Sequence, residues 1–248
     1  MTHLSVNLNK VAYLRNTRNI GIPSVLWAAR VSLDSGASGI TVHPRPDERH
    51  IRRSDVDELA DLLKEYPSAE FNIEGNPFHN LMDIVREVRP HQCTLVPDDP
   101  NQATSDHGWN IDADRDRLIP ILDELRTLGI RSSLFMDADP EEIEKVSQVG
   151  ADRIELYTEP YAAAFTAGNA SETWDRFKRS AETAQDLGLG VNAGHDLNLK
   201  NLGDFLEIPK ILEVSIGHAL FAEALEMGLK KTVREYVRIC SAASPGSK

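Results

Sequence analysis

The sequence predicts an α/β fold, a (β/α)8 TIM barrel with additional helices, formed by residues 1–248 as a single domain. Eight short runs are rich in Val, Ile, Leu and Phe, as buried parallel strands are. Amphipathic helical segments alternate with these runs. Polar residues suited to chemistry end several of the runs, and a barrel gathers such ends at one opening. The length of the chain suits one barrel.

The predicted strands are spread over nearly the whole chain. They lie at residues 4–9, 38–43, 69–74, 92–96, 131–136, 152–156, 189–193 and 212–216. An open doubly wound sheet also alternates strands with helices. However, no G-x-G-x-x-G opens the first helix, so a dinucleotide-binding fold loses its main support. The strand count and the polar strand ends favour the closed barrel.

The clearest helical pattern follows the second strand, in the segment SDVDELADLLKEY. Its apolar face is formed by Val56, Leu59, Ala60 and Leu63. Ser54 with Asp57 resembles a capping box at the start of this helix, with Asp in place of Glu.

Capping residues and glycines predict other helix boundaries. Asp139 is expected to cap a helix that begins with Pro140, and Glu142 to complete the capping box. A glycine closes several amphipathic runs shortly before a strand, because glycine reaches the left-handed conformation cheaply. These glycines are Gly36, Gly129, Gly150 and Gly188. Residues 229–243 are expected to extend the last helix.

Composition excludes several functional classes. The hydrophobic content of 41% supports a packed core, and the net charge of −12 disfavours a nucleic acid partner. A small anion still fits, because arginines gather in the first two strand-to-helix connections. These are Arg15, Arg18, Arg45, Arg49, Arg52 and Arg53, and the alternative for each is solvated surface charge.

Cellular location is predicted from what the sequence does not contain. Cys93 and Cys240 have no metal-binding or redox spacing and do not suggest a secreted disulfide scaffold. The N-terminal residues lack a signal pattern, and no apolar stretch reaches the ~20 residues of a membrane helix. We therefore expect a cytoplasmic protein with no membrane partner.

The strand ends carry the candidate site residues, which are Asn7, Asn9, His43, Glu74, Glu155, His195 and the pair Gly217–His218. In GITVHPRPDERHI, Arg45 and His50 follow His43 in a loop that prolines restrict. Arginine suits phosphate or carboxylate, and histidine exchanges protons near neutral pH. The alternative is an ordinary polar loop.

Carboxylates and glycines complete the candidate site. Glu74 and Glu155 are typical of acid–base groups at a barrel mouth, although either also fits a structural ion pair. Gly194 would let the backbone near His195 approach a ligand. The Gly217–His218 pair opens a helix in the slot where barrels often bind phosphate, so it predicts a phosphate cradle.

Two other chemistries stay open at this point. His43, Glu74, Glu155 and His195 are possible ligands of a divalent metal, but no His-x-His ends the first strand and arginines would adjoin the cation. Lys10 is the only lysine near a predicted strand end, which leaves an aldolase-type Schiff base as another possibility.

Taken together, eight segments make the chain resemble the pyridoxine 5′-phosphate synthase family. They are SVNLNKVAYLRNTR, GITVHPRPDERHI, FNIEGNP, CTLVPDDPNQATSDHG, RSSLFMDADPEEI, RIELYTEPYA, VNAGHDLN and SIGHALFAEA. The resemblance implies a barrel with extra helices that assembles as a homo-octamer. It implies condensation of 3-amino-2-oxopropyl phosphate with 1-deoxy-D-xylulose 5-phosphate, without a metal or an organic cofactor.

The resemblance also implies a role for each site residue. Proton transfer falls on His43, Glu74 and His195, and stabilisation of the transition state on Glu155. Contacts to the amino ketone phosphate fall on Asn7 and Arg18, contacts to the deoxyxylulose phosphate on Arg45, His50 and Thr104, and the phosphate cradle on Asp196, Gly217 and His218. Beside phosphate, Asp196 is expected to offer only its backbone N–H.

One pair departs from the family pattern. The family has an Asp-His pair that contacts the sugar where this chain has Asn9 and Lys10, so the sugar contact is expected to change towards direct binding of an oxyanion. Two other functions remain as alternatives: a phosphosugar isomerase or aldolase, and a non-catalytic sensor of a phosphorylated ligand. Residues 97–110, with Gly108 as a hinge, are predicted to form a lid.

Overall fold

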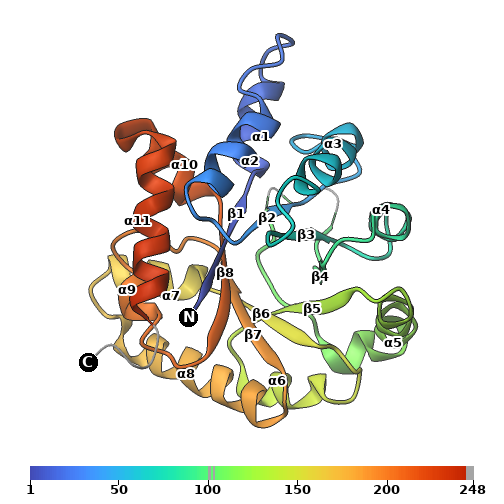
Figure 1. The fold of residues 1–248 in the computed structure, drawn as a ribbon. Helices are drawn as coiled ribbons and strands as arrows, with labels where there is room; N and C mark the ends of the chain where they lie inside the picture. Colours follow the sequence, from blue (N-terminus) through green and yellow to red (C-terminus); the bar gives the residue numbers. More distant parts are fainter. Residues whose placement is uncertain (100–101, 103, 244–248) are drawn as a thin grey trace.

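A computed structural model of the chain describes residues 1–99, 102 and 104–243, and it has a closed barrel of eight parallel strands (Figure 1). The strands are β1 (His3–Asn7), β2 (Gly39–Val42), β3 (Glu70–Gly75), β4 (Gln92–Leu95), β5 (Arg131–Met136), β6 (Arg153–Tyr157), β7 (Gly190–Gly194) and β8 (Ile211–Ile216). Each strand pairs with its neighbours in sequence, and β8 pairs with β1. All eight predicted strands are confirmed, and the open sheet is excluded.

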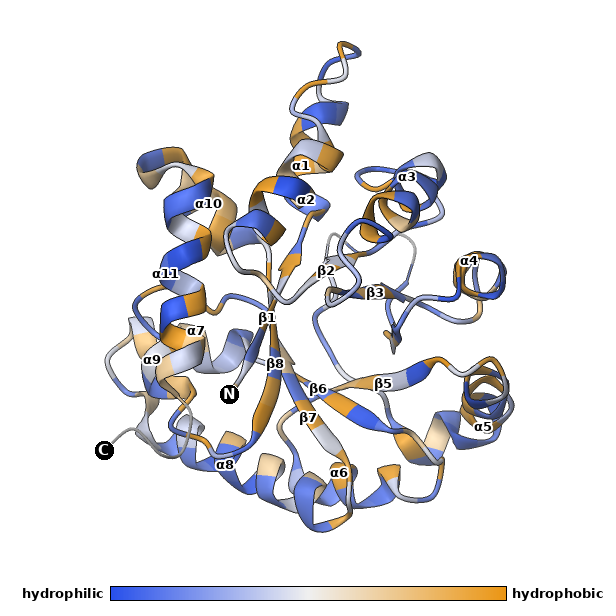
Figure 2. Cartoon of the chain, viewed as in Figure 1, coloured by the Kyte–Doolittle hydropathy of each residue, from blue (hydrophilic) through white to orange (hydrophobic). Residues whose placement is uncertain are grey.

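Helices surround the barrel (Figure 1). They are α1 (Asn9–Asn16), α2 (Val25–Asp34), α3 (Arg53–Leu63), α4 (Leu81–Val88), α5 (Ile111–Thr127), α6 (Pro140–Val146), α7 (Glu159–Thr166), α8 (Ala170–Asp186), α9 (Leu202–Phe205), α10 (His218–Met227) and α11 (Leu229–Ala242). Figure 2 shows polar and apolar residues mixed around the outer helices. Among the described residues, no helix is both long and apolar enough to span a lipid bilayer.

The main core lies between the strands and the helices, where Ile40, Val42, Ile73, Leu134 and Leu156 are fully buried. The interior of the barrel also holds polar side chains. Ser5, Thr41, Asn72 and Thr94 form a chain of contacts there, in which Thr94 donates to Asn72 at 3.1 Å. A buried hydroxyl or amide is tolerated inside the barrel because it forms a hydrogen bond with another polar group.

Most predicted helix boundaries are confirmed. The four glycines predicted to end helices all have positive φ angles: Gly36, Gly129, Gly150 and Gly188. Asp139 caps α6 by accepting a hydrogen bond from the Glu141 amide at 3.0 Å, and Pro140 is the first helical residue. The prediction for Glu142 was wrong, because its carboxylate instead accepts from the Ile111 amide and pairs with Lys145 at 2.7 Å.

The predicted capping box of α3 was also wrong. The helix is capped two residues earlier than predicted, at Arg52, where Asp55 accepts a hydrogen bond from the Arg52 amide at 2.8 Å. Asp55 also forms a buried ion pair with Arg15 of α1. Asp57 is instead on the surface, where it pairs with Arg53 at 2.9 Å. The distant partner Arg15 therefore decides which aspartate turns inward.

The C-terminal segment does not extend the last helix as predicted. Gly228, with a φ angle of 79°, separates α10 from α11. The break allows α11 to turn back and pack against α2 and β1. A continuous helix would carry these residues away from the barrel, so the packing of α11 favours the turn.

Gly108, predicted to be a hinge, is fixed by close packing. A Cβ at this position would overlap the backbone nitrogen of Asp137 and lie 2.6 Å from the Cα of Met136. We expect Gly108→Ala to lower the free energy of unfolding by about 1–3 kcal/mol, because main chain cannot move aside as a side chain can. Urea unfolding measures this change. Gly203→Ala is the matched control, because nothing lies within 4 Å of a Cβ there. Equal stability of the two variants would contradict the prediction.

Candidate active site

A cavity of about 500 Å³ lies at the carboxyl ends of the strands and collects nearly all the predicted site residues. Those that line it are Asn7, Asn9, Lys10, His43, Arg45, His50, Glu74, Thr104, Glu155, His195, Asp196, Gly217 and His218. Arg18 does not line it. This residue is exposed in the loop between α1 and α2, which extends away from the barrel (Figure 1).

The ends of β1 and β2 are joined by side-chain hydrogen bonds. The Asn9 side chain accepts from the His43 amide at 2.9 Å, and the Asn7 side chain accepts from the Asn9 amide at 3.0 Å. These bonds place three of the predicted residues in one connected group. They also give Asn9 a structural role in addition to its predicted contact with substrate.

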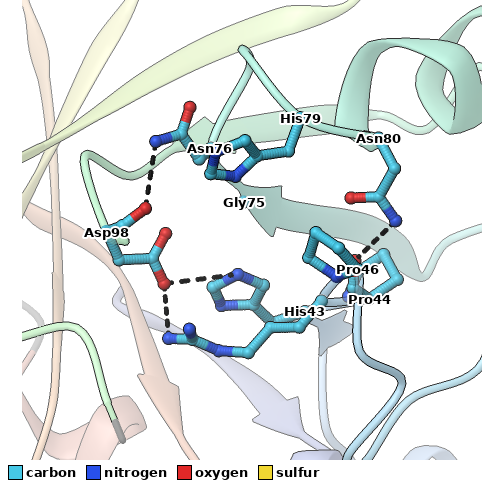
Figure 3. A pocket seen from close by; sticks show the side chains of 9 residues that line it. His43, Pro44, Pro46, Gly75, Asn76, His79, Asn80 and Asp98 are labelled. Carbon is cyan, nitrogen blue, oxygen red and sulfur yellow. Dashed lines mark hydrogen bonds and ion pairs between the residues drawn. The ribbon is translucent and has the colours of Figure 1, made fainter. Parts of the chain in front are cut away.

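His43 lies between two carboxyl groups. Its Nδ1 is 3.9 Å from Oε2 of Glu74, and its Nε2 is 3.7 Å from Oδ2 of Asp98. Asp98 also forms an ion pair with Arg45, and all four side chains are buried. Figure 3 shows Asp98 facing His43. The sequence does not single out Asp98, because a carboxylate in a long connection resembles many others.

Burial shifts the pKa values of the carboxyl groups upwards. The pKa of Glu74 rises to about 8, mainly through burial and then through repulsion by Asp98 and Glu213. Burial raises the pKa of Glu155 well above its ordinary value, and the charges of Glu74 and Glu213 add to the effect. Both groups therefore tend to keep a proton near neutral pH.

The pKa values of the histidines are shifted in the opposite direction. Burial lowers the pKa of His43 well below its ordinary value, with a further contribution from Arg45. Burial also lowers the pKa of His195 and of His50 to about 4. The cavity thus holds neutral imidazoles beside protonated carboxyls, so it contains both proton acceptors and proton donors.

Glu155 depends on a neighbouring glycine. A Cβ at Gly194 would overlap Oε1 of Glu155, so Gly194 makes room for this carboxyl. Gly194 therefore makes room for a side chain of the protein, in addition to its predicted role of letting the backbone approach a ligand. The other oxygen of Glu155, Oε2, is buried and has no hydrogen-bond partner among the described residues. A buried oxygen without a partner in an open cavity is suited to contact a substrate.

The loop after β7 is held in an unusual backbone conformation. His195 and Asp196 have φ angles of 85° and 58°. Side chains other than glycine adopt this region at a cost of roughly 1–2 kcal/mol per residue. Thr158 stabilises the loop by donating to the carbonyl of Gly194 at 2.6 Å, and the Tyr157 ring lies edge-on to His195 at 5.2 Å. Strain of this kind is typical of a functional site.

The cavity also has features for binding anions. Gly217 precedes α10, whose first residue is His218, and no side chain caps this helix start. Free N–H groups at a helix N-terminus bind anions. Arg45, Arg49 and Lys10 also line the cavity, so it offers cationic side chains to an anion although the chain is acidic. Asp196 lies at the exposed rim, and its predicted backbone contact to phosphate stays a prediction.

The structure does not favour the two alternative chemistries, a divalent metal site and a Schiff-base lysine. Among the described residues, no group of three or more His, Cys, Asp or Glu side chains is arranged to hold a metal ion. Lys10 is exposed rather than enclosed in an apolar pocket, with its Nζ 5.9 Å from the centre of the Tyr13 ring. Schiff-base lysines are commonly activated by desolvation, which this position does not provide.

The cavity also includes Arg49, one of the arginines that the sequence indicated for a small anion, and residues that were not predicted from the sequence, namely Tyr13, Ser105, Tyr157, Glu159, Leu197, Ser215 and Ala219. The alternation of side chains along a strand could have predicted that Tyr157 lines the cavity. It lies two residues after Glu155 in β6, so both side chains share the inner face. Ser215 of β8 precedes Gly217 by the same interval.

The raised pKa of Glu74 predicts how stability depends on pH. Because the folded pKa of about 8 exceeds the ordinary value of 4.5, the unfolded chain loses this proton first as pH rises. The stability that Glu74 contributes is complete below pH 4.5 and is lost between pH 4.5 and 8. We therefore expect Glu74→Gln to gain stability relative to the unmodified protein across this range. Thermal unfolding at pH 5 and pH 8 checks this, and a stability difference that does not grow with pH would contradict it.

Comparison with solved structures supports the fold alone. A structure titled "Native KDPGal structure" aligns with a TM-score of 0.64 and 10% identity over 97% of this chain and 95% of that one. The N-(5′-phosphoribosyl)anthranilate isomerase from Pyrococcus furiosus aligns with a TM-score of 0.59 and 14% identity over 98% of this chain and 100% of that one.

Comparison with curated sequences is more specific. The pyridoxine 5′-phosphate synthase of Albidiferax ferrireducens is 57% identical over 96% of this chain and 96% of its own length. The enzyme of the same name from Bacteroides thetaiotaomicron is 53% identical over 95% of this chain and 98% of its own. The family model described as "Pyridoxal phosphate biosynthesis protein PdxJ" matches residues 4–242. The chain therefore belongs to the PdxJ family of pyridoxal phosphate biosynthesis proteins.

Proposed function

We propose that this protein is a pyridoxine 5′-phosphate synthase. It would condense 3-amino-2-oxopropyl phosphate with 1-deoxy-D-xylulose 5-phosphate to give pyridoxine 5′-phosphate, phosphate and water. The observation that carries the proposal is the match to relatives of this name over nearly the whole chain. The cavity supports it, because acid–base groups and anion-binding groups lie together there.

The reaction requires several proton transfers. An amine attacks a ketone, water leaves, phosphate is eliminated, and a carbon–carbon bond closes the ring. In our proposal Glu74 is the principal base, and His43 and His195 transfer protons on either side of the substrates. Glu155 stabilises charge in the transition state. Groups from four strands suit this sequence of steps, because each reaches the substrates from a different direction.

Two phosphate groups must be held at once. We assign Arg45, His50 and Thr104 to the deoxyxylulose phosphate, and the helix start at Gly217 and His218, with Asp196, to the phosphate cradle. Asn7 is assigned to the amino ketone phosphate, and Asn9 and Lys10 to the sugar. Arg18, which the family resemblance also implies for the amino ketone phosphate, lies outside this cavity and is not assigned a contact within it. Binding both substrates in one cavity would lower the barrier through proximity.

A two-substrate assay tests the proposed function. The purified protein is mixed with both phosphorylated substrates, and the pyridine product is followed by its absorbance while released phosphate is measured in parallel. We expect equal amounts of pyridoxine 5′-phosphate and phosphate, and neither when one substrate is omitted. Conversion of a single phosphosugar would indicate an isomerase or aldolase. Binding of both substrates without turnover would indicate a sensor.

We also propose that the protein forms a homo-octamer, as the family resemblance implies. Large apolar side chains exposed near α1 and α2 support contact with further copies of the chain, and these are Leu14, Ile20, Ile22 and Trp27. Sedimentation analysis measures the assembly directly. A species of one or two chains at micromolar concentration would contradict the octamer.

A further inference from the structure

His43 separates the main cavity from a smaller one. The smaller cavity is lined by His43 and Asp98 together with residues of the loops after β2 and β3, including Asn76 and His79 (Figure 3). Glu74 lines only the main cavity, and Asp98 lines only the smaller one. The two nitrogens of His43 therefore face different carboxyl groups: Nδ1 faces Glu74 and Nε2 faces Asp98.

Asp98 is held firmly in this position. Its carboxylate pairs with Arg45, and both side chains are 4% exposed. Oδ2 of the same carboxylate accepts a hydrogen bond from the Ser105 hydroxyl at 3.3 Å. The backbone carbonyl of Asp98 accepts from the Asn76 side chain at 3.0 Å, as Figure 3 also shows. A carboxylate fixed from several sides can orient the groups that it contacts.

We propose that Asp98 is a positioning residue that sets the tautomer of His43 and the direction of Arg45. The carboxylate accepts from Nε2–H of His43, which leaves Nδ1 unprotonated and directed towards Glu74 and the substrates. The ring nitrogen that exchanges protons in the reaction is therefore Nδ1. This inference rests on the proposed function, since it assigns a role within that reaction.

The charges of the cluster are consistent with this arrangement. Arg45 and Asp98 form a buried pair that is neutral as a whole, which is the form in which buried charges are tolerated. Glu74, with its pKa raised to about 8, can both accept a proton as a base and pass it to Nδ1 near neutral pH. Asp98 thus supplies the negative charge on one side of His43, and Glu74 supplies the exchangeable proton on the other.

The distance from Nε2 to Asp98 is 3.7 Å, which is longer than a hydrogen bond. Catalytic hydrogen bonds are often long in a site without substrate and shorten when it binds. The other groups that act on His43 are Arg45, Arg49, His50 and His195, and none of these is an acceptor placed at Nε2. Among the described residues, Asp98 is therefore the carboxylate that can orient this nitrogen.

Kinetics of Asp98 variants test the role. We expect Asp98→Asn to lower kcat by about 10- to 100-fold, a part of the 10²–10⁴ that a positioned acid–base group contributes. The apparent pKa in the kcat–pH profile should fall, because Asp98 raises the pKa of Glu74. Asp98→Glu keeps the charge and should recover most of the lost rate. Asp57→Asn is the matched control: it makes the same change at a surface carboxylate that pairs with Arg53 and lines neither cavity, and it should leave kcat within about threefold.

Two results would overturn the proposal. One is an Asp98→Asn enzyme with unchanged kcat and unchanged pH profile. The other is equal loss of activity in Asp98→Asn and Asp98→Glu, with an unshifted pH profile and a lowered Tm, which would indicate a structural role only. The unmodified protein is assayed with both substrates in the same experiment. If it turns them over, the results for the variants concern only the role of Asp98. If it does not, the proposed function itself fails.

A second measurement needs no variant. Neutron diffraction from crystals of the unmodified protein locates deuterium on imidazole nitrogens directly. We expect deuterium on Nε2 of His43 and none on Nδ1. Deuterium on Nδ1 alone would overturn the proposal, whether or not the Asp98 variants fold.

Discussion

Replacement of Glu74 by Gln is expected to abolish measurable turnover, with a loss in kcat on the order of 10²–10⁴. The buried carboxyl has a pKa of about 8, near the working pH, where a group can both accept and donate a proton efficiently. Glutamine has nearly the same size but cannot exchange a proton. Binding of inorganic phosphate should change little, because the proposed phosphate contacts come from other residues. Steady-state kinetics and titration calorimetry measure the two quantities.

Glu213→Gln is the matched control for this variant. Glu213 is also a buried carboxyl inside the barrel, with a pKa raised to about 7, but it does not line the main cavity. Its amide variant should retain kcat within about fivefold. Turnover of Glu74→Gln at the level of the unmodified enzyme would remove Glu74 from the mechanism. Equal losses in both variants would show that a buried charge, rather than a base at one position, is required.

The second large effect is expected for His195→Asn. The imidazole lies in the cavity beside Tyr157 and Phe135, whose rings are 5.2 and 5.1 Å from it, and it is proposed to transfer protons opposite Glu74. Asparagine tolerates the left-handed backbone that this position requires, so the loop should keep its shape. The loss in kcat should again be about 10²–10⁴, with a small change in KM.

His3→Asn is the control for His195→Asn, because His3 lies exposed at the start of β1, away from the cavity. It should retain full activity. A His195→Asn enzyme that keeps more than about a third of the normal kcat would contradict the proposed proton transfer. If KM alone rises, His195 binds substrate and does not act in the chemical steps.

The barrel was predictable because each strand carries its own signal. The runs at β5 and β6 are short, contain apolar residues such as Leu134 and Ile154, and follow a glycine with a positive φ, as at Gly129 and Gly150. These features depend on local sequence. The site was partly predictable for the same reason, since residues that directly follow a strand, such as His43, must lie at the barrel mouth.

The features that were missed depend on partners distant in sequence. Asp55 rather than Asp57 turns inward because Arg15, 40 residues earlier, needs a buried acceptor. Asp98 belongs to the site because the chain brings it against His43 and Arg45. No local pattern distinguishes such an aspartate from one on the surface. The pairing of charged side chains that are distant in sequence is thus the part of the structure that the sequence alone does not predict.

The most direct test of the account is a crystal structure of the protein with pyridoxine 5′-phosphate and inorganic phosphate bound. We expect the pyridine ring in the main cavity, with Glu74 and His195 on different sides of it and within hydrogen-bond reach of its substituents. One phosphate should lie at the helix start formed by Gly217 and His218. A product bound elsewhere, or one that leaves Glu74 without contact while His195 faces solvent, would contradict the convergence of these strand ends on a single reaction site.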